Sequence, residues 1–172
     1  MAPSDRDQLA AAVRAGKYAG GDLRNADLSG CDCSGADLSG ARLSGANLAR
    51  VRLQGANLRS TLLDMANLQG ADLSGADLEF AVLGGADASG ANFRDANLRC
   101  ANLVGTKGHG ATFDGAKMFY SRPGNADFTG ASFVGADIQR AIFRRANLTN
   151  ANLENTTGQA NFENARLEGA RR

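Results

Sequence analysis

The chain has 172 residues, no Trp and two Pro, and its 19 Lys and Arg against 18 Asp and Glu give a formal net charge of +1. This balance fits one soluble domain and does not favour direct nucleic-acid binding, which usually brings a strong basic excess. No apolar run approaches a membrane span, and residues 1–13 carry early charges without the apolar core of a signal peptide, so we expect no membrane association and a cytoplasmic location.

The first predicted element is a short helix over residues 4–16. Ser4 followed three residues later by Asp7 resembles a capping box with Asp in place of Glu or Gln. Gly16 ends the helix. Its apolar face consists of Leu9, Ala12 and Val13.

This helix precedes a repeat region whose first coil would otherwise be open, with apolar side chains and unpaired strand edges at its end. We interpret the helix as a plug over Leu23 and Leu28 rather than as a helix that binds a partner. The predicted division is therefore residues 1–20, a capping helix and its lead-in, and residues 21–172, a repeat region.

From residue 21 the sequence repeats every five residues. Of the 27 pentads centred on positions 23 to 153, 16 have Leu and 5 have Phe at the centre, and 21 begin with Ala. Examples are ADLSG (36–40), ANLRS (56–60), ADLEF (76–80), ANFRD (91–95) and ANLTN (146–150). A helix has a period of about 3.6 residues and a strand of about 2, whereas a period of five fits one side of a four-sided coil.

These pentads resemble the pentapeptide-repeat family, whose consensus is A(D/N)LXX. The resemblance covers residues 21–172. It implies an all-β fold, a right-handed quadrilateral parallel β-helix, which here would be a solenoid of about seven coils with a short N-terminal capping helix. The motif is specific for the fold and does not by itself assign a function.

The same register predicts how the interior is filled. Side chains of an extended segment alternate, so the first and central residues of each pentad point inward, and four pentads per coil place residues twenty apart in one column. The small centres Ala88 and Gly108 each share a coil with a Phe, and Phe93, Phe113 and Phe133 form one column. A close-packed interior requires that a small side chain be compensated by a large one beside it.

The residues that could carry chemistry are few. Cys31 and Cys33 should face the interior as reduced thiols, because neighbouring inward positions of one strand are poorly placed for a disulfide, and a CxC pair without further ligands is a weak zinc site. His109 lies about 19 Å from both in this register, and Cys100 closes a pentad three coils from them. The outward Asp residues serve turns on a convex wall without a cleft. We therefore predict no catalytic, cofactor-binding or metal-binding residue, and a protein that is not an enzyme.

Two places depart from the repeat. Lys107, Gly108 and His109 interrupt the consensus, and we expect a distorted corner there rather than a binding site. At residues 156–159 the phase slips by one residue before the pattern resumes. The apolar side chains of the last coil would then be left at an open end, which leaves two alternatives, a tail-to-tail homodimer or a monomer with a tight last turn.

The outward positions predict a partner-binding surface. An apolar strip in adjacent coils consists of Leu62, Met65, Phe80, Val82, Cys100, Val104, Phe119 and Tyr120. A basic edge beside it consists of Arg122, Arg140, Arg144 and Arg145. Contiguous apolar patches commonly mark partner sites, so we expect a protein partner with an apolar ridge and acidic flanks. The alternative is that these side chains only pack on one another.

We predict a non-enzymatic protein-protein interaction scaffold that uses the apolar strip. The resemblance implies an alternative, because some members of the family resemble a DNA duplex and protect the type II topoisomerase gyrase from quinolones or peptide toxins. The acidic side of the rod that suits this alternative consists of Asp27, Asp32, Asp72, Asp87, Asp95, Asp114, Asp127 and Glu154. The chain lacks the strong negative balance, carboxyl-terminal dimer helix and inserted loops of those members, so we rank DNA mimicry second. A third hypothesis is a structural accessory whose partner binds the capped end.

Overall fold

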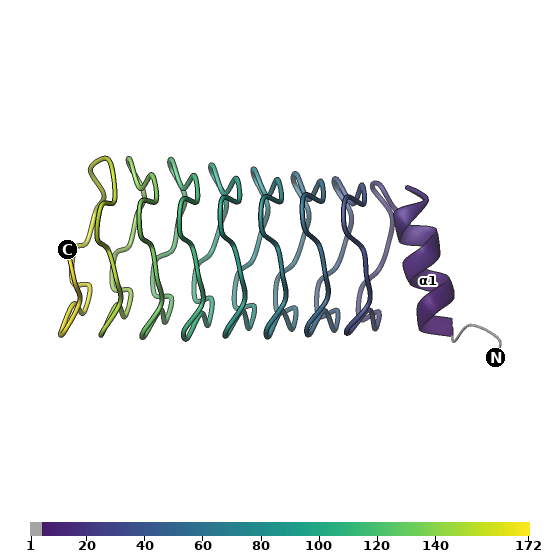
Figure 1. Cartoon of the computed structure of the whole chain (residues 1–172), viewed down its shortest axis with the longest axis horizontal. Helices are drawn as coiled ribbons and strands as arrows, with labels where there is room; N and C mark the ends of the chain where they lie inside the picture. The colour runs from purple at the N-terminus through teal and green to yellow at the C-terminus, as the bar shows by residue number, and fades with distance from the viewer. Residues whose placement is uncertain (1–4) are drawn as a thin grey trace.

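The computed structural model describes residues 5–172 and shows a rod of stacked coils with a helix across its N-terminal end (Figure 1). The helix α1 (Asp5–Arg14) is the one helix in this range, and no helix there is long and apolar enough to cross a membrane. It is shorter than the predicted helix over residues 4–16. Ser4, the predicted capping residue, lies outside the described residues.

The helix α1 packs on the first coil. Ala10 and Val13 are buried and join the apolar interior of the rod. Arg6 Nη1 donates a hydrogen bond to Ser29 Oγ at 3.1 Å, and the Arg14 guanidinium donates to the backbone carbonyl of Asp32. These contacts place the helix over the open end of the coil, as predicted, whereas the division into residues 1–20 and 21–172 stays a prediction.

The rest of the chain is a ladder of single-residue parallel bridges. Up to the bridge of Asp137 with Thr157, each bridge joins the residue before a pentad centre to the residue twenty positions further on, beginning with Asp22 and Arg42. Four pentads therefore close one coil, and residues 21–159 form seven coils, six at this spacing and a seventh that is one residue shorter. The predicted period of twenty is confirmed.

The interior follows the predicted alternation. The first and central residues of the pentads are buried, including Cys33, whose exposed fraction is 0%, and Cys31, at 7%. Both thiols are free, and burial raises the pKa of Cys33 to about 11. The predicted aromatic column is confirmed, because the rings of Phe93 and Phe113 stack at 4.8 Å and those of Phe113 and Phe133 at 4.9 Å.

The space beside Gly108 is filled differently from the prediction. A Cβ on Gly108 would lie 2.6 Å from Cδ1 and 2.7 Å from Cε1 of Phe128, one coil further along the rod. The compensating ring therefore belongs to the next layer rather than to Phe113 in the same coil. A small centre in one coil of this solenoid is thus compensated by a large side chain in the next coil.

Outward Asp and Asn side chains close the turns and link the coils. The backbone N–H of Ser29 donates to Asp27 Oδ1 at 2.9 Å, and Asn47 Nδ2 donates to the same oxygen at 3.0 Å from the next coil. Hydrogen bonds from the Ser29 side chain and N–H lower the pKa of Asp27. The N–H and side chain of Ser39 likewise lower the pKa of Asp37. The predicted turn role of the outward Asp residues is confirmed, and the structure adds their hydrogen bonds between coils.

We expect acid to destabilise the rod through these carboxylates. Because their folded pKa is depressed, their stabilisation is fully present above the unfolded pKa of about 3.9 and is lost as the pH falls through the lower folded value. The variant Asp27→Asn/Asp37→Asn keeps the Oδ1 acceptors but not the charge, so its melting temperature should fall less between about pH 5 and pH 2. Thermal melts followed by circular dichroism measure this. The control, Glu154→Gln/Glu168→Gln, removes carboxylates that accept no side-chain hydrogen bond within residues 5–172, and an equal gain in that control would contradict the assignment.

The C-terminal coil is one residue shorter than the others, as predicted. Ile142 pairs with Asn161, nineteen positions on, and Gly158 at φ 86° sits where a Cβ would be 2.6 Å from the Cα of Gln139. Phe162 in the last coil is half-buried, and the guanidinium of Arg172 lies 5.6 Å from its ring centroid. The last turn is thus partly covered by the chain itself, while the choice between monomer and tail-to-tail homodimer stays open.

Candidate functional site

The apolar strip lies along one flat side of the rod and the two corners that flank it. Phe80, Cys100 and Tyr120 follow one another at spacings of twenty along one corner, each in the left-handed backbone region with φ of 61°, 57° and 56°. Leu62 and Val82 pair directly in the bridge ladder of the adjacent side. The register therefore brings the predicted residues together on adjacent coils.

Exposure divides the strip into two groups. Met65 is 70% exposed, Phe80 51%, Tyr120 41%, Val104 38% and Leu62 37%. The other three residues are half-buried: Val82, Cys100 and Phe119. These exposed residues and Ile142, at 41%, are all the large hydrophobic side chains found exposed within residues 5–172. All of them lie on this one surface.

The aromatic end of the strip is held by its own neighbours. The rings of Phe119 and Tyr120 meet edge to face at 4.5 Å. The guanidinium of Arg99 lies 4.6 Å from the Phe119 centroid, and that of Arg140 lies 5.1 Å from the Tyr120 centroid and also donates to its hydroxyl. The alternative that the side chains of the strip pack on one another therefore holds for Phe119 and Tyr120. Within the described chain, no aromatic or cation-π contact of this kind covers Met65.

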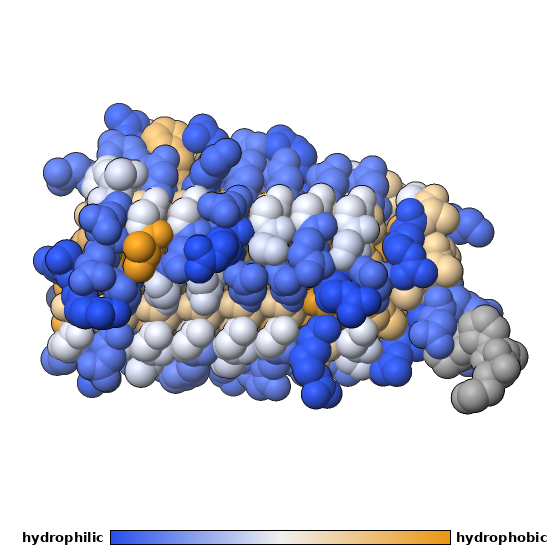
Figure 2. Space-filling view, in the orientation of Figure 1, coloured by the Kyte–Doolittle hydropathy of each residue, from blue (hydrophilic) through white to orange (hydrophobic). Residues whose placement is uncertain are grey.

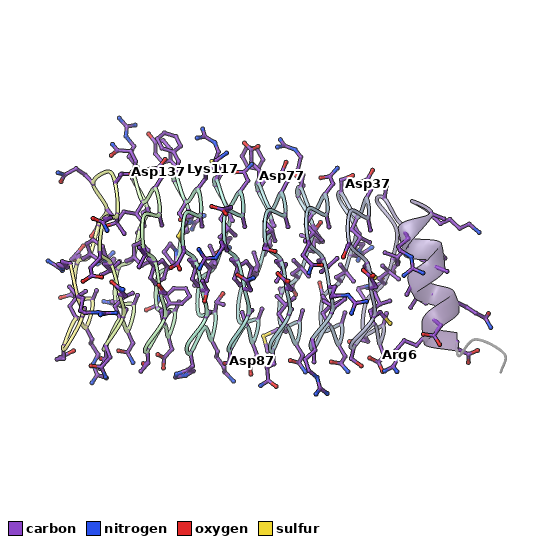
Figure 3. All side chains as sticks on the ribbon, viewed as in Figure 1. Arg6, Asp37, Asp77, Asp87, Lys117 and Asp137 are labelled. Carbon is purple, nitrogen blue, oxygen red and sulfur yellow. The ribbon has the colours of Figure 1, made fainter. Side chains whose placement is uncertain are left out.

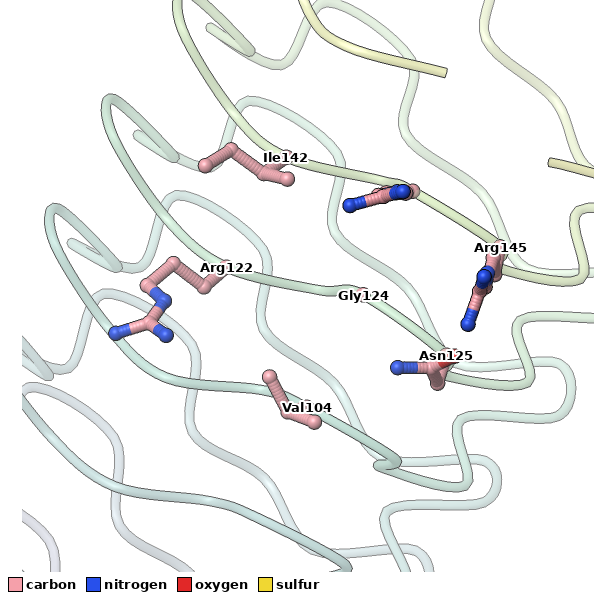
Figure 4. Close-up of a pocket in the computed structure, with 7 residues that line it drawn as sticks. Val104, Arg122, Gly124, Asn125, Ile142 and Arg145 are labelled. Carbon is pink, nitrogen blue, oxygen red and sulfur yellow. The ribbon is translucent and has the colours of Figure 1, made fainter. Parts of the chain in front are cut away.

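Beside Val104 the surface is hollowed into a groove of about 280 Å³ (Figure 4). Its lining consists of Val104, Arg122, Gly124, Asn125, Ile142, Arg144 and Arg145. Three of the four basic-edge arginines thus line one groove, and the fourth, Arg140, stacks on Tyr120 instead. The structure brings the apolar strip and the basic edge together here.

The groove forms where Pro123 interrupts the backbone ladder. In the preceding coil, the N–H of Leu103 donates to the carbonyl of Arg122 at 3.1 Å. Pro123 has no N–H, so within residues 5–172 the carbonyl of Ile142 receives no backbone hydrogen bond, and Arg122 forms no bridge with Ile142. The groove was not predicted from the sequence, although a Pro at a pentad centre followed by Gly, in SRPGN (121–125), indicates such an interruption.

The expected distortion at residues 107–109 is wrong. Lys107 pairs in register with Asp87 on one side and Asp127 on the other, and the N–H of Gly108 donates to the carbonyl of Asp127 at 2.7 Å. The ring of Phe128 fills the space that a side chain at Gly108 would take, so the backbone keeps its path. His109 lies 3.3 Å from the Asp127 carboxylate at the surface.

Polar side chains dominate the face of the rod shown in Figure 2. Figure 3 shows one outward column, with Asp37, Asp77, Lys117 and Asp137 in a row along the rod.

The predicted acidic side carries several ion pairs of its own. They join Asp32 with Arg52 at 3.1 Å, Asp114 with Arg94 at 2.9 Å and Asp27 with Arg6 at 4.0 Å. These basic partners reduce the negative potential of that side.

Within residues 5–172 no group of three or more His, Cys, Asp or Glu side chains is placed to hold a metal ion. The arrangement of the site, an exposed apolar strip ending in an arginine-lined groove, is suited to binding.

Comparisons with known proteins agree with the geometry. The model for pentapeptide repeats matches in eight copies, over residues 16–45, 41–79, 52–87, 89–119 and 124–157. HetL, a pentapeptide repeat protein involved in heterocyst differentiation regulation in the cyanobacterium Nostoc sp., is 35% identical over 89% of this chain and 75% of its own, with a TM-score of 0.48. QnrB1, a plasmid-mediated fluoroquinolone resistance protein, is 26% identical over 90% and 83%, with a TM-score of 0.59. A pentapeptide repeat protein of the Arabidopsis thaliana thylakoid lumen is 28% identical over 83% and 76%, with a TM-score of 0.39. A search of the curated proteins found no match.

Proposed function

The chain belongs to the pentapeptide-repeat family, and from this premise we propose that its coil is right-handed and serves as a non-enzymatic scaffold that binds a protein partner through the apolar strip. Members of a solenoid family differ in function through their outward side chains, because the inward ones are taken up by the core. The proposal therefore concerns the surface and not the repeat itself.

One observation carries the proposal: the exposed large hydrophobic side chains of residues 5–172 gather on one side of the rod and its two flanking corners. Scattered exposed apolar residues are normal on a protein surface, but a contiguous patch commonly marks an interaction site. Met65 and Phe80 are the most exposed of them, at 70% and 51%. Burial of these two side chains by a partner would contribute about 1.5–3 kcal/mol each before the costs of association.

We expect the variant Val82→Asp/Tyr120→Asp to fold normally and to lose its partner. Aspartate suits both places, because Asp occupies the same pentad position as Val82 elsewhere in the chain and tolerates the left-handed backbone of Tyr120. Two charges within the strip should weaken partner capture by about tenfold or more. Affinity capture from a lysate of the source organism, quantified by mass spectrometry, measures this, with circular dichroism as the test of folding.

A matched control carries the same charge change on other sides of the rod. Thr112→Asp replaces a residue at the pentad position of Val82, and Asn150→Asp replaces one at a left-handed corner like that of Tyr120. The control should capture the same partner as the unmodified chain. Equal capture by all three proteins would retire the apolar strip as the binding surface.

A second candidate function is DNA mimicry that protects a type II topoisomerase from quinolones. The similarity to QnrB1 supports it, since that protein is a fluoroquinolone resistance protein and is 26% identical with a TM-score of 0.59. The ion pairs on the acidic side, such as Arg94 with Asp114 at 2.9 Å, argue against it because they dilute the charge that DNA mimicry needs. Capture of gyrase subunits equally by the unmodified chain and by Val82→Asp/Tyr120→Asp would favour this candidate.

A further inference from the structure

The groove over Gly124 differs from the rest of the apolar surface. Its floor at Gly124 has no side chain. The buried Gly124 backbone lies close to the next coil, because a Cβ there would be 3.4 Å from the carbonyl oxygen of Arg144 and 3.8 Å from that of Ile142. Val104 on the coil before and Ile142 on the coil after form apolar walls, both exposed (Figure 4). The Ile142 carbonyl receives no backbone hydrogen bond within the described chain.

Positive charge stands at both ends of this groove. Figure 4 shows Arg122 at one end and Arg145 at the other, with the bare floor at Gly124 between them. Neither guanidinium has a carboxylate within 4.0 Å in residues 5–172, whereas that of Arg144 pairs with Glu163 at 3.3 Å. An occupant would therefore need carboxylates on both sides of an apolar group.

We propose that the groove over Gly124 binds an acidic peptide segment that places one apolar side chain between Val104 and Ile142 and carboxylates on Arg122 and Arg145. This inference rests on the proposed scaffold function and names the chemistry of its partner. A peptide supplies an apolar side chain to contact the Val104 and Ile142 walls together with carboxylates to pair with the two arginines. A nucleic-acid backbone supplies only the negative charge.

Fluorescence anisotropy with a labelled peptide, Glu-Asp-Glu-Leu-Glu-Asp-Glu, tests the proposal directly. Gly124→Leu fills the groove and should weaken binding by about tenfold or more. Gly84→Leu is the matched control, because Gly84 holds the same pentad position on the same side, two coils away, and its Cβ would meet only the Val104 carbonyl at 3.8 Å. This control should bind within about twofold of the unmodified chain. Arg122→Gln/Arg145→Gln leaves the backbone untouched and should also weaken binding, so the test does not depend on the folding of Gly124→Leu.

Two further probes separate the ligand classes. The peptide with Ser in place of Leu should bind about tenfold more weakly, because the apolar walls then lose their contact. An eight-nucleotide thymidine oligonucleotide should not compete. Absence of peptide binding, equal binding by Gly124→Leu, or equal competition by the oligonucleotide would overturn the proposal. Val82→Asp/Tyr120→Asp alters neither the walls nor the arginines of the groove and should still bind the peptide, so failure of the groove and failure of the apolar strip are told apart.

Discussion

Replacing Phe113 with alanine is expected to lower the free energy of unfolding by about 3–5 kcal/mol. Its ring is fully buried, stacks on Phe93 at 4.8 Å and on Phe133 at 4.9 Å, and meets Phe128 edge to face at 5.3 Å. The coils cannot close into the vacated space, because backbone hydrogen bonds of 2.6 and 2.7 Å hold the Phe113 pentad to the coils on either side. The full cost of a cavity should therefore be felt.

Equilibrium unfolding in urea, followed by circular dichroism, measures the loss. Thr112→Ala is the control, because Thr112 belongs to the same pentad but points outward, and a surface change of this kind should stay within about 0.5 kcal/mol. Native-state hydrogen exchange would locate the weakened coils, since a solenoid can open in part rather than as one unit. A loss below about 1 kcal/mol for Phe113→Ala would mean that the aromatic column contributes far less than its burial implies.

The pentad register predicted most of the fold because each position repeats one environment many times. The inward thiols of Cys31 and Cys33, the aromatic column and the short last coil all follow from counting in fives and twenties. The filling of the space at Gly108 did not follow, because a register assigns each side chain to a layer but not the direction in which a ring leans. The Phe128 ring extends into the layer of Gly108 and fills the space there. The backbone therefore keeps its path, and the distortion expected at residues 107–109 was wrong.

The candidate site was predictable only where it follows the register. Outward positions placed Leu62, Met65 and Phe80 on one surface, and the structure finds all three exposed. The groove was not predicted, because it depends on a missing backbone donor at Pro123 and on a missing side chain at Gly124 rather than on residues that carry chemistry. Whether these surfaces bind a partner stays a prediction.

Restoring the consensus Leu at position 108 should destabilise the rod rather than stabilise it. The Cβ of Gly108→Leu would meet Phe128 Cδ1 and Cε1 at 2.6 and 2.7 Å, and overpacking of this kind costs about 1–3 kcal/mol. Phe128→Leu alone should also destabilise the rod, because it leaves the space beside the glycine empty. Urea unfolding of both single variants measures these two losses.

The double variant decides whether the two residues compensate each other. Gly108→Leu/Phe128→Leu gives the column the Leu residues that Leu68 and Leu148 already have, so its stability should return close to that of the unmodified chain. The coupling free energy should then be about 1–3 kcal/mol. Additive losses would show instead that Phe128 can turn aside without cost. Coupling would mean that a consensus Leu stabilises a coil only when the side chain above it in the next coil leaves space for it. A single pentad of this core could then not be replaced by the consensus without a matching change in the next coil.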